Sequence, residues 1–128
     1  RGQKTRRLGM LTIFKQALTV NVYQGTDSFT LLKGAGHFEE TSIWEGNCAI
    51  AGHNRGVRDD FGALHTLEPG DAVIWTTKLG TRTYEVVSAE QVDVLDRSGL
   101  AASQEDRLTL YTCVAGEPDL RWEVIALH

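Results

Sequence analysis

The sequence predicts an all-β domain with a few short helices, closed into an eight-stranded β-barrel. Short runs dominated by β-branched and apolar residues recur between turn-forming residues. Helical patterns are scarce, and we expect only single turns near Asp27, near Asp59 and near Leu100. Many short strands with few helices favour a closed or nearly closed antiparallel barrel.

Eight runs have the composition of strands. In chain order they are Met10–Phe14, Leu18–Tyr23, Asn47–His53, Ala72–Lys78, Thr81–Ser88, Gln91–Asp96, Arg107–Thr112 and Arg121–Leu127. Both prolines fall beside turn formers outside these runs, and a hairpin is expected at Leu79-Gly80. The turns therefore separate the strands in the way that a barrel of short strands requires.

Length and charge limit the domain organisation and the partners. The 128 residues can bury one sizeable core but not two independent ones. We expect residues 1–7, the basic stretch RGQKTRR, to be a flexible N-terminal stub and residues 8–128 to be a single domain. A net charge of −4 argues against a nucleic-acid partner, because phosphate binding needs a basic surface. The first residue is not Met, so we expect the chain to be part of a longer protein.

The two cysteines differ in their predicted environments. Because side chains alternate between the faces of a strand, Leu108 and Leu110 point one way and Cys113 points the other. Cys48 shares a face with the apolar Ile50, so we expect Cys48 to lie on the core side. No C-x-x-C or zinc-type spacing occurs, and we expect neither a metal site nor a cofactor.

Cys113 stands where a strand runs out into a loop, which makes it a candidate nucleophile. A thiol becomes a useful nucleophile when a base or a cation lies beside it. His53 also ends a predicted strand, AIAGH. After Cys113, a loop of only seven residues, Val114–Leu120, leads to Arg121. Such a loop would bring Arg121 close to Cys113, where a guanidinium can hydrogen-bond an oxyanion. Of the other histidines, His37 lies in a glycine-rich loop, His65 lies beside a turn and is expected at the surface, and His128 is terminal.

Together these residues resemble the sortases, the cysteine transpeptidases of the Gram-positive cell surface. The family motif T-L-x-T-C is met at its four fixed positions by TLYTC, Thr109 to Cys113. An arginine follows eight positions later, and an upstream GH closes a strand. The resemblance extends from about Leu8 to Leu127 through segments such as LTVNVY and LEPGDAVIWTT. The short loop after Cys113 and the compact length resemble the class D or class B members.

The resemblance implies a sortase-type β-barrel and a role for each candidate. Cys113 would attack the carbonyl after the Thr of an LPXTG-like sorting signal and form a thioester acyl-enzyme. His53 would be the general acid and base, and Arg121 would stabilise the oxyanion. The acyl group would then pass to an amine, either of a peptidoglycan precursor or of a pilin, or to water.

The resemblance also implies where the substrate binds and where the enzyme works. The predicted substrate-binding residues are Leu110, Tyr111, Thr112 and Val114, with the segment Asp96–Asp106 opposite. The enzyme is expected at the extracellular face of a Gram-positive cell membrane, with a membrane anchor in the full-length protein.

Two other functions remain open from the residues alone. One is a non-catalytic β-barrel binding module of the cell surface, with Trp44, Trp75 and Trp122 as its contact face. The other is an unrelated cysteine hydrolase that cleaves peptides and uses no amine acceptor.

Overall fold

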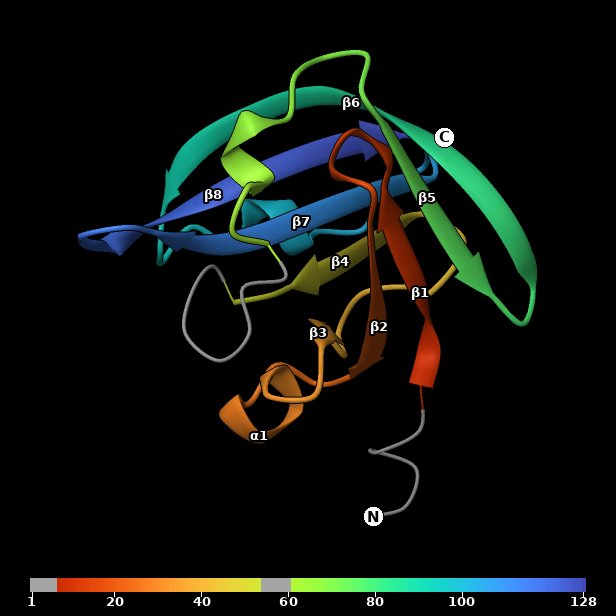
Figure 1. Ribbon diagram of the computed structural model, residues 1–128, viewed down its shortest axis with the longest axis horizontal. Helices are drawn as coiled ribbons and strands as arrows, with labels where there is room; N and C mark the ends of the chain where they lie inside the picture. Colours follow the sequence, from red (N-terminus) through yellow and green to blue (C-terminus); the bar gives the residue numbers. More distant parts are fainter. Residues whose placement is uncertain (1–6, 54–60) are drawn as a thin grey trace.

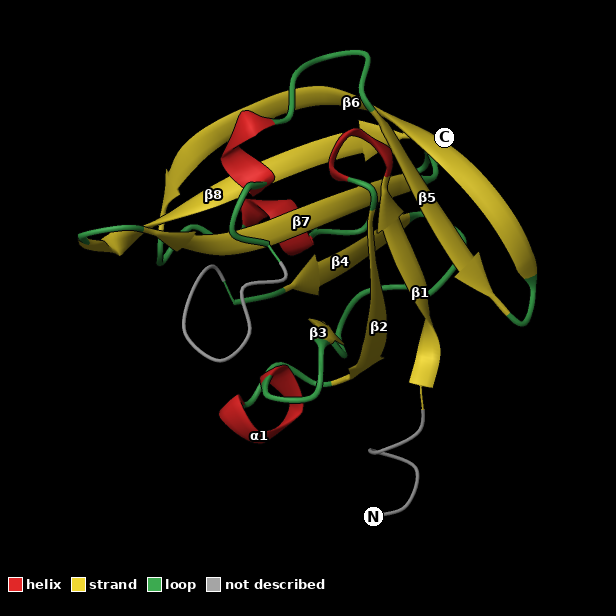
Figure 2. Ribbon diagram, viewed as in Figure 1, coloured by secondary structure: helices red, strands yellow, loops and turns green. Residues whose placement is uncertain are grey.

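The computed structural model describes residues 7–53 and 61–128, and in it eight strands close into one barrel (Figures 1 and 2). The strands are β1 (Arg7–Ile13), β2 (Leu18–Gln24), β3 (Ala35–His37), β4 (Asn47–Ala51), β5 (Ala72–Thr77), β6 (Gly80–Asp93), β7 (Arg107–Val114) and β8 (Glu117–Leu127). Their order around the barrel is β1-β2-β3-β4-β7-β8-β6-β5, and β5 pairs with β1 to close it. The prediction of a closed eight-stranded barrel is confirmed.

Two of the strand pairs are parallel, and one of them positions the site. β2 pairs with β3 and β4 pairs with β7 in parallel, whereas the remaining pairs are antiparallel. Along β4 and β7 the register runs from Asn47 opposite Arg107 to Ala51 opposite Tyr111. Because the two strands run in the same direction, Gly52 and His53, which follow β4, lie beside the last residues of β7.

Four short helical segments connect the strands in the described residues. They are η2 (Phe14–Gln16), α1 (Ser28–Leu31), η3 (Leu64–Thr66) and η4 (Ser98–Leu100). Asp27 caps α1 by accepting a 2.8 Å hydrogen bond from the Thr30 backbone, which is why a helical turn begins there. The predicted turns near Asp27 and Leu100 are confirmed, and Asp59 lies outside the described residues. Among residues 7–53 and 61–128, no helix has the length and apolar character needed to cross a membrane.

The barrel interior holds a single hydrophobic core, whose largest fully buried side chains include Trp75, Tyr84 and Phe61. Leu108 and Leu110 of β7 are fully buried in it, as the alternation along the strand predicts. Cys48 is also fully buried among these residues, as expected for the core side of β4.

Several strands differ from the prediction in their bounds or number; β4, for example, ends at Ala51, two residues before His53. β3 lies in the glycine-rich segment that we expected to be a loop, since glycine carries almost no β-strand signal. β6 is one strand where two runs were expected: its first residues pair with β5, its later residues pair with β8, and the register against β8 shifts between Val86 and Ser88. β1 begins at Arg7, the last residue of the expected stub, while residues 1–6 lie outside the described chain.

The expected loop Val114–Leu120 is instead a tight turn at Ala115-Gly116. Gly116 has φ +76°, which is a conformation that favours glycine. Val114 pairs directly with Glu117, and the register then shifts so that Cys113 pairs with Arg121. Pro118 falls in this irregularity, where a strand tolerates a residue without an N–H group. β8 therefore begins four residues earlier than the sequence pattern indicates.

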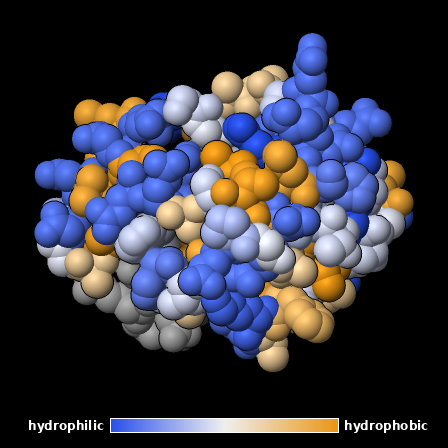
Figure 3. Space-filling model, turned by 90° about the horizontal axis from the view of Figure 1, so that it is seen from above, coloured by the Kyte–Doolittle hydropathy of each residue, from blue (hydrophilic) through white to orange (hydrophobic). Residues whose placement is uncertain are grey.

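Apolar side chains at the surface are dispersed. The large exposed ones are Phe14, Phe29, Leu32, Leu79, Val87 and Leu95, which lie on different elements. Figure 3 shows one face, on which apolar groups form small separate clusters among hydrophilic ones. Scattered apolar residues of this kind are ordinary for a folded surface.

Candidate active site

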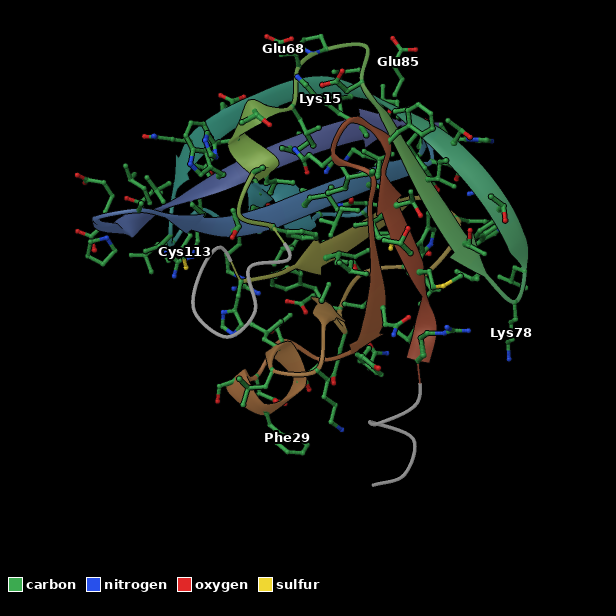
Figure 4. All side chains as sticks on the ribbon, in the orientation of Figure 1. Lys15, Phe29, Glu68, Lys78, Glu85 and Cys113 are labelled. Carbon is green, nitrogen blue, oxygen red and sulfur yellow. The ribbon has the colours of Figure 1, made fainter. Side chains whose placement is uncertain are left out.

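Cys113 lies near the end of β7 and is exposed to solvent (Figure 4). Neither Cys113 nor Cys48 is in a disulfide. Burial raises the pKa of the Cys48 thiol to about 12, which leaves that sulfur protonated at neutral pH. Of the two sulfurs, only that of Cys113 is accessible to a peptide substrate.

His53 is held beside Cys113 by the parallel pairing of β4 and β7. The Gly52 N–H donates a 3.1 Å hydrogen bond to the Tyr111 carbonyl. The Thr112 hydroxyl donates a 2.8 Å hydrogen bond to the Gly52 carbonyl. These two bonds tie the residue before His53 to the two residues before Cys113, so the imidazole and the thiol start from neighbouring backbone positions.

Arg121 faces Cys113 directly across the β7–β8 ladder. Its guanidinium donates hydrogen bonds from Nη1 to the carbonyls of Leu120 (2.8 Å) and Pro118 (3.1 Å). These two hydrogen bonds anchor the side chain to the first residues of its own strand. The side chain is half-buried. A planar guanidinium has further N–H groups that can donate to a substrate oxygen.

His53, Cys113 and Arg121 all line one cavity of about 330 Å³, which we call the donor pocket. The volume is within the range of pockets that bind small ligands or peptide side chains. One wall is formed by the end of β6 and by the segment between β6 and β7, residues 94–106, which carries η4 and which we call the connector. Another wall is formed by α1 together with Thr26 and Phe38. The structure thus brings the three predicted catalytic residues together at a single pocket.

Of the four predicted substrate-binding residues, Tyr111 and Thr112 line the donor pocket. Val114 does not; it lines a second cavity on the other side of Cys113. Leu110 is fully buried in the core and lines neither cavity, so its prediction as a substrate-binding residue is wrong. The reason is the strand alternation itself, which turns Leu110 into the barrel while Tyr111 points outward.

Some walls of the donor pocket were not predicted from the sequence. Leu31 of α1 and Phe38 after β3 line it, although their sequence patterns suggest only a helical turn and a loop. Asp96, Arg97 and Leu100 come from the segment that we expected to lie opposite Cys113. The Asp27 cap could have located α1, but no local signal indicates that α1 covers this end of the barrel.

A buried polar network lies under the connector that forms the pocket wall. The Tyr111 hydroxyl donates a 2.6 Å hydrogen bond to Glu123, and both side chains are buried. Burial, together with the hydrogen bond to Glu123, raises the pKa of Tyr111, so its hydroxyl stays protonated. On the neighbouring strand, Asn47 Nδ2 donates to the carbonyls of Gly99 (2.7 Å) and Ala101 (2.9 Å). The network therefore fastens the connector to the outer face of the barrel.

Other chemistries find little support in the described part of the chain. Within residues 7–53 and 61–128, no group of three or more His, Cys, Asp or Glu residues is arranged to hold a metal ion. Trp75 has no exposed surface, and Trp44 and Trp122 pack against the core. The three tryptophans thus do not form the exposed contact face that a binding module would need.

Comparison with known proteins identifies the family. The sortase domain model matches residues 11–126. The chain belongs to the sortase family. This match includes His53, Cys113 and Arg121 together with seven of the eight strands in full or nearly so.

Two sequence relatives are similar to this sortase chain over most of its length. Sortase D of Bacillus subtilis (strain 168) is 32% identical over 108 residues, which are 82% of this chain and 53% of the relative. Sortase A of Listeria monocytogenes is 26% identical over 110 residues, which are 83% of this chain and 49% of the relative. The sortase chain described here thus spans about half the length of these relatives.

Solved sortase structures share the fold. Sortase A from Corynebacterium diphtheriae superposes with a TM-score of 0.89 at 26% identity, covering 95% of this chain and 60% of that one. Sortase C-1 from Streptococcus pneumoniae gives a TM-score of 0.90 at 25% identity, covering 96% and 67%. The predicted sortase-type barrel is confirmed, whereas the class D or class B assignment stays a prediction.

Proposed function

We propose that this chain is the catalytic part of a sortase-type cysteine transpeptidase, with Cys113 as nucleophile, His53 as general acid and base, and Arg121 as oxyanion-binding residue. The observation that carries the proposal is that these three side chains line one pocket at the end of β7. Membership in the sortase family supports the same reaction class.

In the first step His53 takes the proton of the Cys113 thiol, and the sulfur attacks the carbonyl carbon of the Thr in an LPXTG-like sorting signal. The tetrahedral intermediate places negative charge on the carbonyl oxygen, and the Arg121 guanidinium donates hydrogen bonds to it. The C–N bond then breaks, and His53 gives its proton to the leaving amine. The product is a thioester between the Cys113 sulfur and the Thr carbonyl of the amino-terminal part of the signal.

In the second step an amine attacks the thioester. His53, now neutral, accepts a proton from the attacking nitrogen, the C–S bond breaks, and the Cys113 sulfur is restored. A new amide joins the acyl group to the acceptor. Water in place of the amine gives hydrolysis.

Membership in the sortase family supports a further proposal about the partners and the location. The donor is a surface protein with a sorting signal, and the acceptor is an amine of a peptidoglycan precursor or of a pilin. The enzyme works at the extracellular face of a Gram-positive cell membrane, where a membrane anchor in the full-length protein holds it. The net charge of −4 argues against a nucleic-acid partner.

A quenched fluorescent LPXTG peptide, incubated with and without an added primary amine, tests the proposal. Wild-type protein is expected to cleave the peptide and to form the amide product when the amine is present. Cys113→Ala and His53→Ala are expected to abolish both reactions, and Cys48→Ala is the matched control that keeps them. Cleavage by Cys113→Ala would refute the proposal, and cleavage without amide formation would instead favour a cysteine hydrolase.

A further inference from the structure

Thr109, the first residue of the motif TLYTC, is fully buried although it lies on the outer face of the barrel. Alternation along β7 places Thr109 on the same face as Tyr111 and Cys113. A polar side chain that is buried on this face needs a covering segment and a hydrogen-bond partner. The connector covers it, and the partner is Asn47 of β4, which is 2% exposed.

Thr109 fixes the orientation of the Asn47 side-chain amide. The Thr109 hydroxyl donates a 2.8 Å hydrogen bond to Asn47 Oδ1. The amide nitrogen is therefore turned to the connector, where it donates to the carbonyls of Gly99 (2.7 Å) and Ala101 (2.9 Å). In the reverse orientation Oδ1 would face two carbonyl oxygens, which cannot donate. The hydroxyl thus selects the orientation in which the amide holds the connector.

The two carbonyls that Asn47 holds flank Leu100, which lines the donor pocket. The connector backbone is also supported from below, because the Tyr111 hydroxyl and the Glu123 carboxylate lie against Gly99. Leu100 is therefore placed in the pocket wall by bonds made to the residues on either side of it.

Thr109 and Asn47 can act on a bound peptide only through the connector. Both side chains are buried, and neither is among the residues that line the donor pocket. A peptide in that pocket contacts Leu100 but cannot reach the hydroxyl or the amide behind it.

We propose that Thr109 and Asn47 are positioning residues for the donor peptide. The Thr109 hydroxyl orients the Asn47 amide, and the amide holds Leu100 in the wall of the donor pocket. The inference rests on the proposed function. It gives Thr109 a role separate from that of Thr112, whose hydroxyl bonds to the Gly52 carbonyl beside the proposed general base.

Three variants separate the hydroxyl, the amide and the shape of the side chains. Thr109→Val keeps the shape and removes the hydroxyl, whereas Thr109→Ser keeps the hydroxyl. Asn47→Asp keeps an acceptor for Thr109 but turns an oxygen towards the connector carbonyls. Val20→Ala is the matched control, because it removes core contacts on β2 without touching the connector. Melting temperatures report the stability of each variant.

Steady-state kinetics with an LPXTG peptide measure the effect on substrate binding. Thr109→Val is expected to raise KM by about three- to tenfold, the equivalent of one lost hydrogen bond, and Asn47→Asp by more. The value of kcat should stay within about a factor of two, since a higher KM at constant kcat marks lost binding of the peptide. Thr109→Ser and Val20→Ala should keep the KM of the wild type.

Amide hydrogen exchange followed by mass spectrometry tests the connector without any substrate. Exchange in residues 94–106 should be faster in Thr109→Val and Asn47→Asp than in the wild type, because the connector opens more often. Thr109→Ser should restore the slow exchange, and peptides from β1 should exchange equally in all of these proteins.

The outcomes separate this inference from the proposed function. Faster connector exchange together with a raised KM supports the positioning role. An unchanged KM in Thr109→Val and Asn47→Asp overturns that role, and so does an equal rise of KM in Val20→Ala. A wild type that leaves the peptide intact overturns the proposed function and with it the role towards the peptide. The exchange data would then still show whether Thr109 and Asn47 hold the connector.

Discussion

Tyr111 donates a 2.6 Å hydrogen bond to Glu123 directly across the β7–β8 hairpin, two residues along each strand from the pair Cys113 and Arg121. The two pairs lie on the same outward face of the hairpin. The connector with η4 covers the Tyr111–Glu123 pair at Gly99 and then lines the donor pocket with Leu100. The Tyr111–Glu123 hydrogen bond and the pair proposed to be catalytic thus lie in one ladder.

Tyr111→Phe is expected to destabilise the protein, because it leaves the buried Glu123 carboxylate without this donor. The free energy of unfolding should fall by about 1–3 kcal/mol. Urea denaturation followed by fluorescence measures the change. Tyr23→Phe on β2 is the matched control, and equal losses in the two variants would contradict a special role for the Tyr111–Glu123 bond.

Gly99→Ala is expected to displace the connector. A Cβ atom at position 99 would collide with the Tyr111 hydroxyl and with the Glu123 carboxylate. We expect a loss of stability of about 1–3 kcal/mol, as for overpacked interiors. The KM for the sorting-signal peptide should also rise, since Leu100 would leave its place in the pocket wall. The exposed Ala101→Ser substitution on the same connector should change neither quantity; an unaltered KM in Gly99→Ala would argue that the wall does not contact the peptide.

A thiol-directed alkylating reagent at pH 8 is expected to modify Cys113 in the folded protein and to spare Cys48. With a pKa of about 12, the Cys48 thiol is ionised to roughly one part in ten thousand at this pH, and it is also buried. Peptide mapping by mass spectrometry identifies the modified residue. Both cysteines should react after denaturation, and modification of Cys48 at the same rate as Cys113 before denaturation would disprove the assigned burial.

Arg121→Ala is expected to lower kcat/KM by about a hundred- to a thousandfold, the usual cost of losing an oxyanion donor. Arg121→Lys should recover only part of this loss. The planar guanidinium of Arg121 donates to the Leu120 and Pro118 carbonyls and has further N–H groups for a substrate oxygen, whereas the compact ammonium group of lysine lacks this planar arrangement of donors. Steady-state kinetics with the LPXTG peptide measure both variants. Activity of Arg121→Ala within a factor of about three of the wild type would remove Arg121 from the mechanism.

His37 is expected to make the stability fall as the solution becomes acidic. Burial lowers the pKa of His37 below its ordinary value of 6.5, although the Ser42 carbonyl and the nearby Glu39 and Glu40 oppose the shift. The unfolded chain therefore takes up a proton at a higher pH than the folded one, and stability is lost as pH falls from about 7 through 6.5 towards the folded pKa. Comparing unfolding free energies at pH 8 and pH 5 measures this loss. It should be smaller in His37→Gln, and an equal loss in the two proteins would show that other groups cause it.

Most of the fold could be predicted from local sequence patterns. Alternation along LTLYTC correctly predicts that Leu108 and Leu110 enter the core and that Cys113 does not, because each position depends only on its own strand. The position of Cys113 near the end of β7 is also a local property, whereas β4 ends at Ala51, two residues before the strand end predicted at His53. The proximity of His53 and Cys113 follows from the parallel pairing of β4 with β7, which the order of strands in the chain does not reveal.

The parts that could not be predicted depend on contacts between distant segments. β3 has only three residues and two neighbours in the barrel, and its glycine gives no β-strand signal of its own. Pro118 indicates a loop, yet it is accommodated at an irregularity where β8 shifts register against β7. The resemblance implies substrate contact for Leu110 as part of its motif, but alternation along β7 buries this side chain in the core.

The hydrogen bond between the Thr112 hydroxyl and the Gly52 carbonyl spans sixty positions of the chain. Closing so long a loop costs entropy before any contact repays it, so this bond belongs to the late stage of folding. A refolding chain is therefore expected to regain core fluorescence before it regains the ability to cleave a peptide. The delay between the two signals would time the moment at which the barrel closes.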